Sequence, residues 1–211
     1  MVEAAKKPNP GAKDAVRNTY TPVYFDSNAT YAINLTEYST EVNSGISEAM
    51  KDLEQKGTET GYEHMYLVNL KTGGKDFYEC NENTSSVGYE YQKYIREHPS
   101  ERFAFIHNHN TDGSLSETDM RTLLNFDQIP VMIAVRNDGV IYAAEREGPV
   151  LKTGDFDGFC EEKLKHLREQ LKNGTITRAQ WTKQRELIIV DNLLKDYTKG
   201  GRLIEYDTRR K

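Results

Sequence analysis

Between residues 37 and 147, apolar residues recur with two different periods, and these periods predict an alternation of helices and strands. Over 37–56 they return every three or four positions, as on one face of a helix, and Gly57 follows as the expected stop. That face consists of Val42, Ile46, Met50 and Leu53. Strand-like runs are expected at 63–70, 75–80, 102–109, 131–136 and 140–145, with helices at 85–99 and 116–126.

Two turn sequences connect these elements. "KTGG" joins the first two strand-like runs and "NDG" joins the last two, so each pair is expected to form a hairpin. The resulting order is α–β–β–α–β–α–β–β. Such an order predicts a mixed α/β (α+β) fold, in which helices flank a central mixed sheet.

The two ends of the chain differ in character from this middle part. Residues 1–30 are rich in Lys, Asn, Pro and Ala and are expected to form an arm or linker. The main domain is then expected over 31–150, and a C-terminal helical extension over 151–211. Two charged segments within 157–198 predict a helical hairpin, and "RLIEYDTRRK" could include a short strand. The hairpin could pack on the sheet, form a homo-oligomer or bind a protein partner.

Composition narrows the classes of function. The chain has 211 residues, of which 36 % are hydrophobic and 29 % charged, with a net charge of −5. This charge disfavours nucleic acid and anionic membranes as partners. We find no signal-peptide pattern and no apolar run long enough to span a bilayer, so a cytoplasmic protein is expected. The spacing of Cys80 and Cys160 matches no metal or redox motif.

The candidate chemistry begins at the end of the strand expected over 102–109. His107 and His109 are two residues apart, so in a strand both side chains point to the same side of the sheet. Asp119, in the first turn of the next expected helix, is the nearest further ligand. Two histidines and one carboxylate would hold one Zn²⁺ per chain and leave a fourth position for water, as in catalytic zinc sites. Most isolated H-x-H pairs are ordinary histidines, and we expect His64, His98 and His166 to be structural or solvent-facing.

A zinc-bound water, whose pKa falls to roughly 7, needs a general base within reach. Glu63, at the start of the strand expected over 63–70, is our choice, and Glu79 and Glu90 are less well placed. Ser116 has two interpretations that are compatible with each other. It fits a capping box with Asp119, and its hydroxyl could also stabilise an oxyanion.

Taken together, Glu63, His107, His109, Ser116 and Asp119 resemble the motif of the JAMM or MPN+ metallopeptidases. The resemblance covers roughly 40–147 and implies that family's cytidine-deaminase-like core. It implies a zinc ion held by both histidines and the aspartate, a glutamate that deprotonates the water, and a serine that steadies the tetrahedral intermediate. Family members cleave peptide bonds, or isopeptide bonds to ubiquitin-like proteins.

Two details of the motif depart from the family pattern. Asn110 stands where the family usually has a proline, and six residues rather than seven separate His109 from Ser116. The loop is similar to bacterial and phage versions, such as those fused to head-morphogenesis proteins. The sequence therefore predicts a bacterial- or phage-type zinc hydrolase of peptide or isopeptide bonds, acting on a protein or peptide.

Two other functions remain open from the sequence. The chain could be a non-catalytic interaction module on the same fold, in phage assembly or a DNA-associated process. It could also be a toxin-type effector domain, since the arm and the hairpin could be remnants of a larger polypeptide. The letters "HNH" at 107–109 do not indicate an HNH nuclease, whose named residues are spread over a longer ββα unit.

Overall fold

The structure is a computed structural model that describes residues 37–80, 88–110, 113–199 and 204–207. The predicted arm at 1–30 and the beginning of the helix predicted over 85–99 lie outside these residues. The elements in chain order are α1 (Thr40–Thr60), β1 (His64–Asn69), β2 (Lys75–Cys80), α2 (Glu90–Glu97), β3 (Phe103–His109), α3 (Glu117–Asn125), β4 (Val131–Arg136), β5 (Val140–Glu145), α4 (Thr153–Lys172), α5 (Arg178–Tyr197) and β6 (Ile204–Asp207). The predicted order of helices and strands is confirmed.

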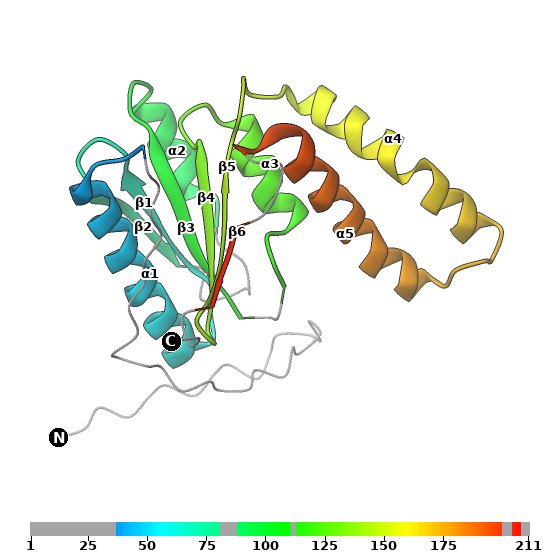
Figure 1. The fold of residues 1–211 in the computed structure, drawn as a ribbon, viewed down its shortest axis with the longest axis horizontal. Helices are drawn as coiled ribbons and strands as arrows, with labels where there is room; N and C mark the ends of the chain where they lie inside the picture. Colours follow the sequence, from blue (N-terminus) through cyan, green and yellow to red (C-terminus); the bar gives the residue numbers. More distant parts are fainter. Residues whose placement is uncertain (1–36, 81–87, 111–112, 200–203, 208–211) are drawn as a thin grey trace.

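The strands form one mixed sheet with the order β2-β1-β3-β4-β5-β6. The pair β3–β4 is parallel, because α3 carries the chain back across the sheet between them, and the other neighbouring pairs are antiparallel. Helices lie on both faces of the sheet, as Figure 1 shows. The predicted mixed α/β class, with helices flanking a central sheet, is confirmed.

The alternation of side chains along β3 divides the core between the two faces. Phe103 and Phe105 pack in the cluster beneath α2, α3 and α5, whereas Ala104 and Ile106 pack in the cluster beneath α1. This two-residue period continues to the end of the strand. His107 and His109 therefore point to the side of α3, and Asn108 points to the side of α1.

Helix α1 corrects one prediction. All four predicted core residues of its apolar face are buried, but the helix does not stop at Gly57. It continues to Thr60 and ends at Gly61, which has a φ of 73° and donates its backbone N–H to the carbonyl of Gly57. Gly57 instead marks a close approach, since a Cβ there would lie 2.3 Å from Nδ2 of Asn108.

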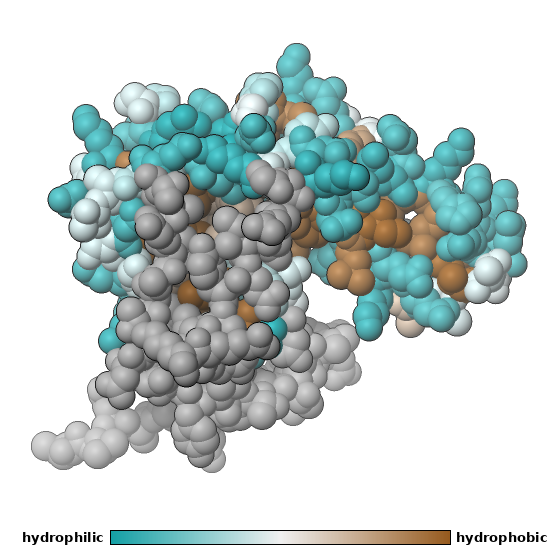
Figure 2. All heavy atoms as spheres, in the orientation of Figure 1, coloured by the Kyte–Doolittle hydropathy of each residue, from teal (hydrophilic) through white to brown (hydrophobic). Residues whose placement is uncertain are grey.

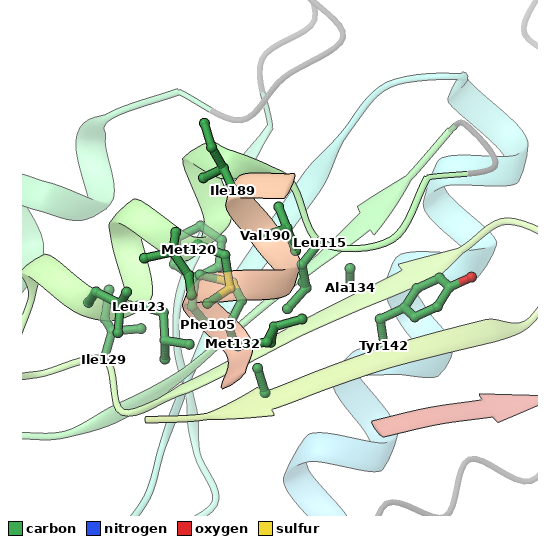
Figure 3. Packing of buried hydrophobic residues seen from close by; sticks show 14 of the residues in the cluster. Phe105, Leu115, Met120, Leu123, Ile129, Met132, Ala134, Tyr142, Ile189 and Val190 are labelled. Carbon is green, nitrogen blue, oxygen red and sulfur yellow. The ribbon is translucent and has the colours of Figure 1, made fainter. Parts of the chain in front are cut away.

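The C-terminal helices share the hydrophobic core of the sheet. Ile189 and Val190 of α5 pack with Met120 and Leu123 of α3 above the sheet (Figure 3). Arg185 of α5 also forms an ion pair with Glu117, in the first turn of α3. The helix that carries Asp119 is thus held between the sheet and α5.

The predicted helical hairpin is present as α4 and α5, and its tip extends away from the sheet (Figure 1). Figure 2 shows apolar residues along the seam between the two helices and hydrophilic residues on their outer sides. After the hairpin the chain returns to the sheet, where β6 pairs antiparallel with β5. Among the helices that the structure describes, none combines the length and apolarity needed to cross a membrane.

Candidate metal centre

His107 and His109 lie at the end of β3 on one face of the sheet, as the sequence predicts. Both side chains are buried, with 1 % and 8 % of their surface exposed. Their Nε2 atoms lie 2.9 Å apart. Two ring nitrogens at that distance cannot both present lone pairs to each other, so a proton or a cation must lie between them.

Asp119 comes to the same point from the first turn of α3. The predicted capping box is present. Oγ of Ser116 accepts from the backbone N–H of Asp119 at 3.2 Å, and the backbone N–H of Ser116 donates to Oδ2 of Asp119 at 2.6 Å. This second bond leaves Oδ1 directed at Nε2 of His107, 3.2 Å away. Nε2 of His109 lies 3.5 Å from Oδ2.

These distances suit a tetrahedral metal ion. Bonds of about 2.0–2.1 Å at tetrahedral angles place the ligand atoms about 3.3 Å apart. The two Nε2 atoms, 2.9 Å apart, and Nε2 of His107 with Oδ1 of Asp119, 3.2 Å apart, lie close to that value. His107, His109 and Asp119 can therefore hold a metal ion, since each offers one ligand atom within 4.8 Å of the others. In the part of the chain that the structure describes, no other group of His, Cys, Asp or Glu side chains does so.

The tautomer of His109 also suits a ligand. Its Nδ1 lies 3.4 Å from the carbonyl oxygen of Gly113, which can only accept. In the neutral ring, the form that binds a metal, we therefore assign the proton to Nδ1 and the lone pair to Nε2. His107 is oriented by packing, with its ring edge-on to Phe105 at a centroid distance of 5.5 Å. Its Nδ1 has no hydrogen-bond partner among the described residues.

The charges of the centre favour a cation between these groups. Burial lowers the pKa of His109, but the hydrogen bond and the charge of Asp119, with the charge of Glu63, raise it to about 9. Burial likewise raises the pKa of Asp119, and His107 and His109 outweigh this and hold it well below its usual value. In the metal-free protein the carboxylate therefore retains a proton on His109, and a metal ion would take that proton's place.

Glu63 lies near the metal centre, immediately before the first residue of β1 and not within the strand as predicted. Met65 of β1 pairs with His107 in the antiparallel ladder, and Glu63 lies two residues before Met65, beyond the last pair. Its carboxylate is partly buried and acts electrostatically on His109. His64, next along β1, points the other way, toward Thr60 and Tyr78.

The side chains of the two other candidate bases, Glu79 and Glu90, lie at the start of α2. Both carboxylate oxygens of Glu79 accept backbone N–H groups at the start of α2, from Glu90 at 3.3 Å and from Tyr91 at 3.1 Å. Gly88 makes room for this cap, because a Cβ there would lie 1.9 Å from Oε1 of Glu79. Glu90 itself is exposed in the first turn of α2.

Polar side chains on the reverse side of β3 were not among the predicted site residues. Asn108 has no exposed surface, and Asn137, at the turn after β4, is 6 % exposed. Both bond to Asn110, the residue after His109, and we call these three side chains the asparagine network. The available signal was an asparagine at an inward position of an otherwise apolar strand.

The remaining predicted positions agree with the structure. His98 bonds through Nδ1 to the carbonyl of Tyr94, and His166 is exposed on α4, both apart from the metal centre. No protein-family model, curated protein or solved structure matches the chain. The assignment of the centre therefore rests on its own geometry.

Proposed function

We propose that the chain is a zinc-dependent hydrolase of peptide or isopeptide bonds. One observation carries the proposal: two imidazoles and one carboxylate converge on a point, with a further carboxylate near them. A mixed nitrogen and oxygen donor set with three protein ligands is typical of catalytic zinc sites, which keep one position open. The order of these residues along the chain, which resembles the JAMM pattern, supports the same function.

When bound, a zinc ion would polarise the scissile carbonyl and acidify a water molecule. Glu63 accepts the proton of the attacking water and passes it to the leaving amine nitrogen as the amide bond breaks. The hydroxyl of Ser116 uses its oxygen to cap α3, so its proton remains available to donate to the oxyanion. Asp119 keeps one oxygen for the metal because the backbone N–H of Ser116 binds the other.

Metal content tests the first half of the proposal. Purified full chain is expected to bind about one zinc ion with the three ligands intact, and none tightly after Asp119→Ala or the double change His107→Ala with His109→Ala. His166→Ala is the matched control, because it removes an exposed histidine of α4 and leaves the centre untouched. Equal zinc content in wild type and the ligand variants, measured by mass spectrometry of the metal, would refute the site.

Substitution of Glu63 tests the second half of the proposal, the hydrolytic mechanism. Glu63→Gln is expected to keep zinc and to lower the hydrolysis rate of a peptide and isopeptide panel by at least 10²-fold, the lower end for a lost general base. Glu79→Gln is the control, since it changes a carboxylate that caps α2. A Glu63→Gln protein as active as wild type would exclude this mechanism. A zinc-loaded wild type that cleaves no member of the panel would favour the non-catalytic module.

A further inference from the structure

The buried amide of Asn108 binds both neighbours of Glu63. Its Oδ1 accepts from the backbone N–H of His64 at 2.7 Å, and its Nδ2 donates to the backbone carbonyl of Tyr62 at 3.0 Å. One side chain thus bonds to the peptide groups immediately before and after the glutamate. It does so from β3, at the position between the two histidine ligands.

Asn110 connects these hydrogen bonds to the end of α1. Its Oδ1 accepts from Nδ2 of Asn108 at 3.0 Å and from Nδ2 of Asn137 at 2.9 Å, and its own Nδ2 donates to the carbonyl of Gly61 at 2.8 Å. The backbone N–H of Asn137 also donates to the carbonyl of His109 at 3.3 Å. The asparagine network therefore connects the last residues of β3 to the whole segment 61–64.

These contacts lie on the α1 side of the sheet, whereas the ligands lie on the α3 side. At this end of the sheet, the last residue pair between β1 and β3 is Met65 with His107. Glu63 lies just beyond that pair. The start of β1 also pairs with β2, through His64 and Cys80, but that ladder lies on the edge of β1 away from β3. On the β3 side, Asn108 bonds to the peptide groups around Glu63, at the position where a general base must keep a set distance from the metal.

We propose that Asn108 is a positioning residue, which with Asn110 and Asn137 holds Glu63 beside the metal centre. The inference rests on the proposed role of Glu63. It also accounts for the departure from the family pattern at Asn110, because a proline there would have no side-chain amide to join the three asparagines.

Asn69 provides a matched control on β1. It too is buried, and its amide makes four hydrogen bonds, to Asp76, Glu101 and the backbone N–H groups of Lys71 and Thr72. The amide of Asn108 likewise makes four, the fourth from its Nδ2 to Oδ1 of Asn137 at 3.5 Å. It lies at the opposite end of the strand from Glu63. Asn69→Leu and Asn108→Leu therefore remove similar buried bonding, and only the second loosens the segment that carries the base.

The experiment measures acetohydroxamate binding to the full chain loaded with Co²⁺, followed through the visible absorption of the metal. Acetohydroxamate occupies open coordination positions, and its proton is shared with a neighbouring carboxylate, so its affinity reports where Glu63 stands. We expect Glu63→Gln and Asn108→Leu each to weaken this affinity about ten-fold, the lower bound for groups supporting a metal site. Asn69→Leu is expected to leave it unchanged.

The double variant, with Glu63→Gln and Asn108→Leu in one chain, decides whether Asn108 acts through Glu63. If it does, Asn108→Leu has no further effect in the Glu63→Gln background, whereas an independent role would give the same ten-fold loss in both backgrounds. An additive result, or unchanged affinity in Asn108→Leu, overturns the inference and leaves the proposed function standing. Should Asn108→Leu fail to fold, Asn110→Ala replaces it in the same comparison of single and double variants. Asn110 is a partly exposed member of the network.

The same experiment separates this inference from the proposed function. No substrate is needed, so a non-additive cycle supports the positioning role even if hydrolysis of the peptide panel is never observed. If wild type binds no Co²⁺, the proposed function and the positioning role fail together.

Discussion

Replacing Gly57 by alanine should destabilise the protein, although the same change stabilises most exposed helices. Gly57 is buried in the last full turn of α1. A Cβ at this position would lie 2.3 Å from Nδ2 of Asn108 and 2.5 Å from Oδ1 of Asn137. Neither amide can simply rotate away, because both are bonded into the asparagine network.

Opposing terms set the size of the effect. Alanine in a helix interior gains about 1 kcal/mol over glycine. Overpacking a filled site costs about 1–3 kcal/mol, and a buried polar group that loses its partner costs about 1–3 kcal/mol more. The net expectation for Gly57→Ala is a loss of roughly 1–5 kcal/mol of unfolding free energy. Metal binding should also weaken, because Asn137 of the network bonds to the backbone carbonyl of His109.

Gly158 in α4 gives the comparison. It is exposed in a helix interior, and a Cβ there would have no atom within 4 Å, so Gly158→Ala should gain about 0.5–1 kcal/mol. Urea unfolding of both variants, with the zinc dissociation constant measured beside it, provides the assay. If Gly57→Ala is as stabilising as Gly158→Ala and binds zinc normally, the close approach has no energetic weight and the reasoning is wrong.

Two further predictions concern the centre itself. The metal-free protein should lose stability as pH rises from 6.5 through about 9, because the pKa of His109 is raised in the folded state and its proton stabilises that state only while bound. At 1.36 kcal/mol per pH unit the loss of unfolding free energy is roughly 3 kcal/mol. Bound zinc should remove this pH dependence. A urea midpoint of the metal-free protein that does not change with pH would contradict the interpretation. Ser116→Ala should cost about 1 kcal/mol through the lost cap of α3. Ser116→Asp should restore the cap but not the hydrolysis rate, and full activity in Ser116→Asp would exclude the oxyanion role.

The elements and their buried faces could be predicted from the sequence because they depend on neighbours along the chain. A period of two along β3 places His107 and His109 on one side wherever the strand lies in the sheet. The capping box of Ser116 and Asp119 is likewise local, since it joins residues three positions apart. For these reasons the three predicted ligands could be named before their convergence was seen.

The glycine prediction failed for an equally physical reason. A missing Cβ permits a turn with positive φ, and it also permits another part of the chain to approach closely. Gly61 does the first, with a φ of 73°, and Gly57 does the second, against Asn108, which lies 51 positions further along the chain. The sequence around a glycine does not distinguish these two uses.

The sequence by itself determined the helices, the strands, their inward faces and the histidine pair with its helix-capping aspartate. The tertiary structure decided which distant groups meet. It brings Glu63 near His109, places Glu79 as a cap of α2, packs α5 on α3, and bonds the asparagine network to the segment around Glu63. The physical reason is that periodicity and capping act over a few residues. Strand order and register, in contrast, come from packing the whole sheet between its helices, and no short stretch of the chain contains that information.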